Sequence, residues 1–252
     1  MQAFSLKDQV ALITGASRGI GFAMAQTFAQ AGAKVVLSSR DQGVLDQMAS
    51  ELRSQGYEAI GVACHVGKVE QLPALVESCI QAYGQLDILV NNAASNPCFG
   101  PVEDTSLEAY DKIMNVNLKA PFELMRLCLP YLKASKQGSV LNISSVGGIS
   151  PEPGLGIYSV SKAALISMSK AFAKEWGKYG IRVNAICPGL IQTKFSEALW
   201  SNESILKHTL KGLAIQRMGT PEEMAALALY LVSPAAAYTT GAVFTADGGL
   251  TI

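Results

Sequence analysis

Residues 10–21, which read VALITGASRGIG, form the stretch that decides the fold. Val10–Thr14 is an apolar run of strand-forming residues, and residues 22–30 have a helical pattern. The glycines between them allow a tight turn, a close approach of backbone to a pyrophosphate, and close packing of helix on strand. Free N–H groups at the start of the helix can bind that anion. The stretch therefore predicts a dinucleotide site with these cofactor contacts: Gly15, Ser17, Arg18, Gly19, Ile20 and Gly21.

Two other interpretations of this turn fail. Residues 15–19 have the GxSxG form of a hydrolase nucleophile elbow. In that fold the elbow follows several strands, one of whose loops supplies the oxyanion hole, whereas this turn follows the first strand of the chain. A P-loop would have lysine after its last glycine, where this chain has Phe22. A turn that is glycine-rich only for packing is the alternative that other motifs must exclude.

Strand and helix patterns alternate along the rest of the chain. Strands are expected at residues 34–39, 58–63, 86–90, 139–143, 181–187 and 242–245, and helices at 43–54, 69–83, 106–133, 157–176 and 221–231, the last capped by Thr220. Nearly continuous apolar strands separated by helices indicate a parallel sheet covered on both faces. The sequence predicts an α/β fold, a single Rossmann-type domain over residues 1–252 with about seven strands. The irregular stretch 193–213 is expected to be a substrate lid.

Composition and charge limit the function classes. The 252 residues are 49% hydrophobic, which suits a large core, and no linker or repeat divides them. Twenty basic and twenty acidic residues cancel, so nothing predicts binding to nucleic acid or to an anionic membrane. The first residues lack a signal-peptide pattern, and no charge-free stretch approaches the ~20 residues of a membrane span. We therefore expect a cytoplasmic protein.

Cysteine and histidine are few and scattered. The five cysteines are widely spaced and mostly in apolar surroundings, which is typical of reduced thiols: Cys64, Cys79, Cys98, Cys128 and Cys187. His65 and His208 are the two histidines, and no CxxC or His/Cys cluster occurs. No metal site is therefore expected.

The end of the second strand indicates which dinucleotide binds. A Rossmann fold places an acidic residue there to bind the adenosine ribose, but this chain has Ser39 followed by Arg40. The carboxylate that would repel a 2′-phosphate is missing, and Arg40, together with Arg18, can attract that phosphate. We expect NADP(H) rather than NAD(H); the alternative is that Arg40 is only a solvated surface charge.

The reaction centre is expected at Tyr158 and Lys162, which share one face of a helix about one turn apart. A nearby ammonium favours a phenolate, so Lys162 is expected to lower the Tyr158 pKa from its ordinary value near ~10. Ser145 follows a strand, at the sheet edge where such folds bind ligands. Tyr-x-x-x-Lys by itself also occurs often by chance on amphipathic helices. The assignment of a reaction centre therefore depends on the other motifs of the chain.

Several motifs occur in one order along the chain: TGASRGIG at 14–21, NNA at 91–93, NVN at 115–117, Ser145, YSVSK at 158–162, PG at 188–189 and DGG at 247–249. In this combination, and over essentially its full length, the chain resembles the short-chain dehydrogenase/reductase family. The resemblance implies hydride transfer between a nicotinamide cofactor and a carbonyl or alcohol.

The resemblance also implies a role for each matching residue. Tyr158 corresponds to the general acid/base, and Lys162 to the residue that lowers its pKa and binds the nicotinamide ribose. Ser145 corresponds to the hydroxyl that orients the carbonyl oxygen, and Asn117 to the asparagine that supports a water chain to the lysine. Further cofactor contacts are implied at Asn92, Pro188, Gly189, Ile191 and Thr193.

Two positions depart from the family pattern. Many members have an acidic or amide residue after the third strand to hold the adenine, where this chain has Cys64-His65-Val66, and the glycine of NNAG is Ala94. His65 and Val66 are still expected at the adenine. Residues 64–68, 96–100 and 199–200 resemble the NADP-dependent retinol dehydrogenase/carbonyl reductase subgroup, whose peroxisomal members reduce retinal, aromatic ketones and α-dicarbonyls.

These features predict the reversible NADPH-dependent reduction of a small-molecule carbonyl, a hydrophobic or aromatic ketone or aldehyde. The expected pocket is apolar and is lined by Phe99, Leu155, Leu190, Phe195 and Trp200. The alternatives are a 3-oxoacyl-carrier-protein reductase, which would need a basic surface patch, and a catalytically silent NADP-binding regulator. Segments 106–133 and 157–176 resemble the family's subunit interface, so a homotetramer is expected.

Overall fold

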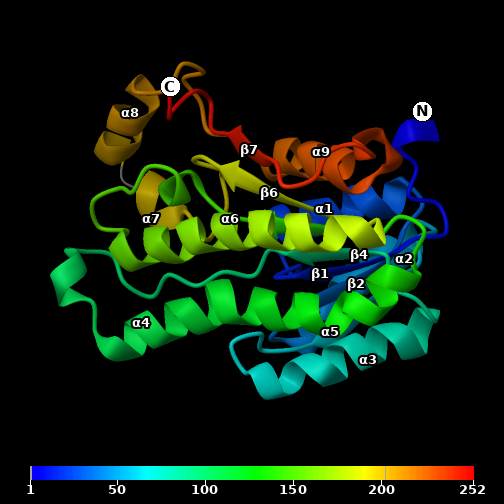
Figure 1. Ribbon diagram of the computed structural model, residues 1–252. Helices are drawn as coiled ribbons and strands as arrows, with labels where there is room; N and C mark the ends of the chain where they lie inside the picture. Colours follow the sequence, from blue (N-terminus) through cyan, green and yellow to red (C-terminus); the bar gives the residue numbers. More distant parts are fainter. Residues whose placement is uncertain (1, 202) are drawn as a thin grey trace.

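The centre of the molecule is one parallel sheet (Figure 1). The structure, a computed structural model, describes residues 2–201 and 203–252. Within them the strand order is β3-β2-β1-β4-β5-β6-β7, and each neighbouring pair is parallel. The strands are β1 (Val10–Thr14), β2 (Lys34–Ser39), β3 (Ala59–Ala63), β4 (Ile88–Asn91), β5 (Ser139–Ile143), β6 (Arg182–Pro188) and β7 (Val243–Ala246). The predicted doubly wound sheet is confirmed.

The strand order reverses at β1, which lies between β2 and β4. Ala11 of β1 is opposite Val35 on one side and Ile88 on the other. In doubly wound sheets ligands bind outside the carboxyl ends of the strands at such a switch point. The glycine turn follows β1 and the Asn91–Asn92 pair ends β4, so both lie at this edge of the sheet.

Helices cover both faces of the sheet (Figure 1). One layer consists of α1 (Gly19–Gln30), α2 (Gln42–Ser54) and α9 (Pro221–Val232). The other consists of α3 (Leu72–Tyr83), α4 (Leu107–Met114), α5 (Ala120–Ala134) and α6 (Gly156–Trp176). Every position of β1, β4 and β5 is buried because side chains from both layers pack on these strands. Among the described residues, no helix combines the length and the apolar character that a membrane crossing requires.

The predicted helix 106–133 is three helical segments in succession. α4 ends at Met114, a π-helical turn, η4 (Asn115–Lys119), follows, and α5 begins at Ala120. The expectation of one uninterrupted α-helix is wrong at this turn. Single π turns within α-helices are frequent at functional sites, and this one contains Asn117.

Short 3₁₀ turns connect several of the longer elements. They are η1 (Gln2–Phe4), η2 (Val69–Gln71), η3 (Val102–Asp104), η5 (Val146–Gly148), η6 (Gly177–Tyr179) and η7 (Pro234–Ala236). The predicted cap of α9 is confirmed as a capping box: Thr220 Oγ1 accepts from Glu223 N (3.4 Å), and the Glu223 carboxylate accepts from Thr220 N (2.9 Å).

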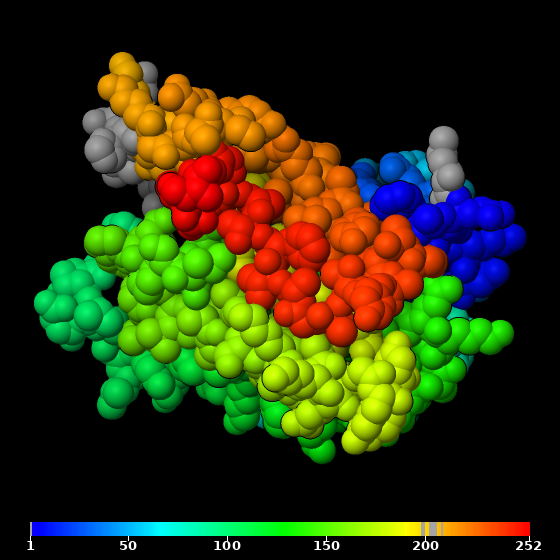
Figure 2. Space-filling view, turned by 45° about the horizontal axis from the view of Figure 1, so that its top comes forward, coloured from blue at the N-terminus to red at the C-terminus, as the bar shows by residue number. Residues whose placement is uncertain are grey.

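The stretch predicted to be a lid, 193–213, contains two helices, α7 (Glu197–Trp200) and α8 (Glu203–Lys211). Asn202 and the side chain of Leu199 lie outside the described residues. Just outside the two ends of the stretch, Ile191 and Gly219 pair by an isolated β-bridge, so both ends lie close together. Figure 2 shows this segment, in orange, projecting beside the C-terminal residues, in red.

Candidate active site

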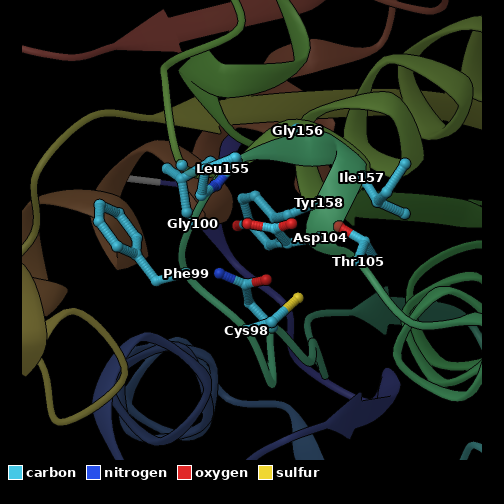
Figure 3. Close-up of a pocket in the computed structure, with 12 residues that line it drawn as sticks. Cys98, Phe99, Gly100, Asp104, Thr105, Leu155, Gly156, Ile157 and Tyr158 are labelled. Carbon is cyan, nitrogen blue, oxygen red and sulfur yellow. The ribbon is translucent and has the colours of Figure 1, made fainter.

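Tyr158 and Lys162 lie one turn apart near the start of α6, and both are buried. Lys162 Nζ donates to the Ile143 carbonyl oxygen (2.8 Å) and lies 5.6 Å from the centre of the Tyr158 ring. Figure 3 shows Tyr158 among the residues that line a pocket. The phenol is thus presented to the pocket, while the amine is held at the end of β5.

Ser145 lies between β5 and turn η5, and its position is fixed by that turn. Its Oγ accepts from Gly147 N (3.1 Å). The turn is pressed against α6, because a Cβ on Gly148 would lie 2.7 Å from the Lys162 carbonyl carbon. Since the Ser145 oxygen accepts from the backbone, its own hydrogen is left to donate toward the Tyr158 phenol, with which the hydroxyl is hydrogen-bonded.

Burial dominates the electrostatics of the pair. It raises the pKa of the Tyr158 phenol to about 12, although hydrogen bonding with the Ser145 hydroxyl opposes that shift. The Glu152 carboxylate adds to the rise. Burial also lowers the pKa of the Lys162 amine to about 8. The expectation that Lys162 brings the Tyr158 pKa down is therefore wrong for the protein by itself, because desolvation of the phenolate is the larger effect.

Asn117 is fully buried and ties two parts of the site together. Its Oδ1 accepts from Ser95 N (2.8 Å), and its Nδ2 donates to Ser95 O (3.0 Å) and to Ser161 Oγ (3.1 Å). These bonds join the loop after β4 to α6, beside Lys162. In this structure Asn117 is a positioning residue.

The glycine turn after β1 has the geometry of an anion site. Gly15 and Gly19 have φ values of 65° and 56°, which favour glycine. α1 begins at Gly19 with no side-chain cap on its N–H groups and no acidic residue in its first turn. These donors are available to a phosphate, and the predicted contacts Ser17, Arg18 and Ile20 lie in the same turn.

Asn92 supports this turn from the end of β4. Its Nδ2 donates to Thr14 O (2.9 Å) and Gly15 O (3.1 Å), and its backbone N donates to Thr14 Oγ1 (3.0 Å). A Cβ on Gly15 or Gly21 would collide with this amide, at 2.9 and 2.5 Å. The side-chain nitrogen of Asn92 therefore holds the turn in shape rather than pointing to a ligand.

Ser39 and Arg40 follow at the end of β2, next to β3, where Cys64 N donates to Ser39 O (2.7 Å). Arg40 and Arg18 are both exposed. Across residues 2–201 and 203–252, neither guanidinium is held by an ion pair or by a side-chain hydrogen bond. Two unpaired cations thus lie at the ends of β2 and β1, the corner where a ribose phosphate would bind.

His65 and Val66 follow β3 at the same edge. The His65 Nδ1 accepts from Gly67 N (3.2 Å), and its backbone N donates to Gln71 Oε1 (2.8 Å). Because Nδ1 is an acceptor, a neutral His65 carries its proton on Nε2 and offers a donor there. Val66 is buried.

The residues after β6 close the other side of this edge. Gly189 packs on the C-terminal turn, since a Cβ would lie 2.6 Å from Asp247 Cα. Ile191 is buried in the core, so only its backbone can reach a ligand. Thr193 reaches the glycine turn, because its Cγ2 would lie 3.3 Å from a Cβ on Gly19. Pro188 is the last residue of β6.

The pocket at Tyr158 contains some of the predicted lining residues (Figure 3). Phe99 and Leu155 line it, and the Phe195 ring lies 6.1 Å from the Tyr158 ring. Leu190 and Trp200 are not among the residues that line it, so their place in a substrate site stays a prediction. Trp200 Nε1 donates to Thr193 O (3.1 Å), which turns its ring back to the base of the 193–213 segment.

The sequence interpretation missed the polar part of this lining. It consists of Asn96, Cys98, Asp104 and Thr105. These residues are brought to Tyr158 by a bridge between Gly100 and Leu155, in which Gly100 N donates to Gly154 O (3.1 Å). The place of these residues in the sequence could have predicted their role. They belong to the loop after β4, and the loops that follow parallel strands meet at the carboxyl edge of the sheet, where ligands bind.

The cysteines are free thiols in the structure. Burial raises the pKa of Cys64 to about 11 and that of Cys79 to about 12, so both are protonated and unreactive at neutral pH. Within the described part of the chain, no three side chains of His, Cys, Asp or Glu come together as a metal-ligand set.

Comparison with known proteins agrees with this geometry. The family model described as Enoyl-(Acyl carrier protein) reductase matches residues 15–251. Dehydrogenase/reductase SDR family member 4 of Homo sapiens is 41% identical over 244 residues, which cover 97% of this chain and 88% of the human protein. The chain belongs to the short-chain dehydrogenase/reductase family. The Sus scrofa protein of the same name is 42% identical, with the same coverage.

Solved structures of this family share the fold. A gluconate 5-dehydrogenase from Burkholderia cenocepacia, in complex with NADP and tartrate, is 30% identical with a TM-score of 0.95 and covers 99% of this chain and 98% of its own. A blue fluorescent protein from a metagenomic library, in complex with NADPH, is 29% identical with a TM-score of 0.91 and covers 98% of this chain and 100% of its own. The chain is an NAD(P)-dependent oxidoreductase of this family.

Proposed function

We propose that this protein catalyses the reversible NADPH-dependent reduction of a hydrophobic or aromatic carbonyl compound to an alcohol. The observation that carries the proposal is the convergence of Ser145, Tyr158 and Lys162 at the carboxyl edge of the sheet, on the same edge as an uncapped helix N-terminus. One end of this edge suits a phosphate and the other suits a carbonyl oxygen.

The residues at this edge fit NADP(H). The uncapped N–H groups of α1 suit the pyrophosphate, and the unpaired Arg18 and Arg40 suit a 2′-phosphate, which the missing acid at Ser39 does not repel. His65, whose Nδ1 accepts from Gly67 N, offers its Nε2 as a donor for the adenine. When bound, the cofactor supplies the hydride.

The catalytic residues act on the carbonyl oxygen. Ser145, whose oxygen is engaged by Gly147 N, donates its hydrogen to that oxygen as negative charge grows on it. Tyr158 has a pKa of about 12 and is protonated at neutral pH, so it is ready to deliver the proton that completes the alcohol. Lys162, held by the Ile143 carbonyl, presents a cation to this site.

Two alternatives fit the site less well. A reductase for acids carried on an acidic carrier protein would need a basic surface at the pocket, but the pocket lining contains Asp104 and neither lysine nor arginine. A silent NADP-binding regulator would not need a buried lysine and an oriented serine beside the tyrosine. The structural similarity to a gluconate 5-dehydrogenase suggests sugar acids as a further substrate class. The pocket lining disfavours them, because it has no lysine or arginine to bind their carboxylate.

The proposal is tested with Tyr158→Phe, which removes the proton donor and leaves the cofactor corner intact. A panel of ketones, aldehydes and α-dicarbonyls is assayed by NADPH oxidation. We expect turnover in the unaltered protein and a loss of ~10²-fold or more in kcat for the variant, with NADPH binding by fluorescence unchanged.

Tyr238→Phe is the matched control, because this ring is fully exposed and far along the chain from the site. Its kcat should equal that of the unaltered protein. Full activity in Tyr158→Phe, or no NADPH oxidation with any carbonyl of the panel, would contradict the proposed function.

A further inference from the structure

The pocket beside Tyr158 carries negative charge only. Asp104 is the one charged residue among those that line it (Figure 3). A second carboxylate, Glu152, lies in the loop just before α6 and acts on the Tyr158 phenol through its charge. In the described part of the chain, neither carboxylate is held by an ion pair or by a side-chain hydrogen bond. Both charges are therefore uncompensated on the substrate side of the site.

The loop that carries Glu152 is fixed rather than loose. Pro151 and Pro153 flank Glu152 and restrict the backbone on both sides. Gly154 O accepts from Gly100 N (3.1 Å), and a Cβ on Gly154 would lie 2.9 Å from the Phe99 ring. The ring and the bridge hold the loop against the segment that contains Asp104. Gly154 and Leu155 of the Glu152 loop line the same pocket as Asp104, so Glu152 lies in a loop that forms one wall of it.

Glu152 is also half-buried, and its carboxylate is partly removed from water. Burial raises its pKa, as expected for a carboxylate without a cation beside it. The nearest cation of the site, Lys162, already donates to Ile143 O. Lys194, which precedes Phe195, is exposed and does not line the pocket. A substrate carboxylate placed beside Tyr158 would meet the Asp104 carboxylate of the lining, the negative charge of Glu152 that already acts on Tyr158, and no cation from the lining.

We propose that Glu152 and Asp104 make this pocket select uncharged carbonyl compounds and reject those that carry a carboxylate next to the carbonyl. The inference rests on the proposed function and names its substrate class. A substrate carboxylate is repelled more strongly by the half-buried Glu152 than by the exposed Asp104, and such repulsion can change a substrate preference several-fold. Keto acids and sugar acids are thereby excluded, whereas neutral ketones and α-dicarbonyls are accepted.

The test compares two substrates that differ in charge but hardly in shape, benzoylformate and its amide, benzoylformamide. In the unaltered holoenzyme with NADPH, kcat/KM should be at least about tenfold higher for the amide. Glu152→Gln should raise the ratio of acid to amide efficiency about fivefold, and Asp104→Asn, at a more exposed position, should raise it less. The ratio of kcat/KM for the two substrates is measured because a change in Tyr158 itself should alter both efficiencies equally and leave their ratio unchanged.

Glu175→Gln is the matched control, since it makes the same change on an exposed position of α6, 17 residues beyond Tyr158. It should leave the ratio unchanged. Equal efficiencies for acid and amide in the unaltered protein, or an unchanged ratio in both site variants, would overturn the inference while leaving carbonyl reduction in place. Absence of turnover with the whole carbonyl panel would instead refute the proposed function on which it rests.

Discussion

Lys162 is the residue at which activity and stability conflict most clearly. Its amine is buried, and its one hydrogen bond in the described residues is to the Ile143 carbonyl oxygen. Burial lowers the pKa of the amine from 10.5 to about 8, so the folded protein binds this proton less tightly than the unfolded chain does. At neutral pH the fold retains a cation at a cost in stability, and the cost makes sense if the cation serves the chemistry.

The first prediction at this scale concerns Lys162→Met. The cost of the buried cation is fully present below pH 8 and disappears as pH rises toward 10.5, where both states lose the proton. The variant should therefore be relatively most stable at pH 7. Between pH 7 and 10.5, the difference in free energy of unfolding should shift by up to about 3 kcal/mol in favour of the unaltered protein. Urea denaturation across this range measures it.

Comparing the two proteins cancels groups that titrate in this range without touching Lys162, such as the thiols of Cys64 and Cys79. Lys170→Met is the control, because Lys170 is exposed on the same helix and should give a difference that does not vary with pH. A difference for Lys162→Met that is equally flat would show that the amine is solvated in the folded protein.

Arg40→Asp is the second prediction at this scale. The exchange removes an unpaired cation at the corner beside Ser39 and adds a charge that repels a 2′-phosphate. The ratio of kcat/KM for NADPH over NADH should fall by at least about tenfold. Steady-state kinetics with both cofactors and one carbonyl substrate measures it.

Lys174→Asp, at an exposed position of α6, changes the net charge equally and should leave that ratio as it is. If Arg40→Asp also left it as it is, Arg40 would be an ordinary surface charge and the preference for NADPH would have to come from Arg18 or from elsewhere.

Among the elements, local patterns explain what the sequence predicted well. The unit of β1, turn and α1 depends on an apolar run and on glycine spacing within 21 residues, and both are visible in the chain. The π turn at Asn115–Lys119 is different, because its residues have the same pattern as an α-helix. It coincides with the hydrogen bonds of Asn117 to Ser95 and Ser161, which are 22 and 44 residues away in the sequence.

The pocket likewise has one part that local sequence patterns predict and one part that depends on contacts between distant segments. Tyr158, Ser145 and Lys162 were predicted because they form a motif on adjacent elements. The polar lining, including Asp104, depends on the bridge between Gly100 and Leu155. These residues belong to two different loops, and no local sequence pattern predicts that the loops pair. The direction of the Tyr158 pKa was missed for a related reason: burial is a property of the folded molecule, whereas spacing reveals only which charges are near.

The whole molecule exposes an apolar surface that the described residues leave uncovered. A groove between α4, η4, α5 and α6 is lined mainly by apolar side chains: Met114, Leu118, Phe122, Ala164 and Met168. Phe122 is 40% exposed and packs edge-on against Phe172, which extends the surface along α6. A contiguous exposed apolar surface of this kind is typical of a protein–protein interface.

We predict that this groove is a subunit interface and that the protein is a homotetramer in solution. Multi-angle light scattering should give four times the 26.6 kDa of one chain. Phe122→Glu would place a charge in the groove and leave it unpaired on association, so the variant should dissociate to smaller species. Val44→Glu introduces the same charge at an exposed position of α2, in the opposite helix layer, and should stay tetrameric.

A mass of one chain for the unaltered protein, or an intact tetramer in Phe122→Glu, would contradict the prediction. Since the groove includes residues of η4 and α6, which also position Asn117 and Tyr158, dissociation should lower carbonyl reductase activity together with the mass.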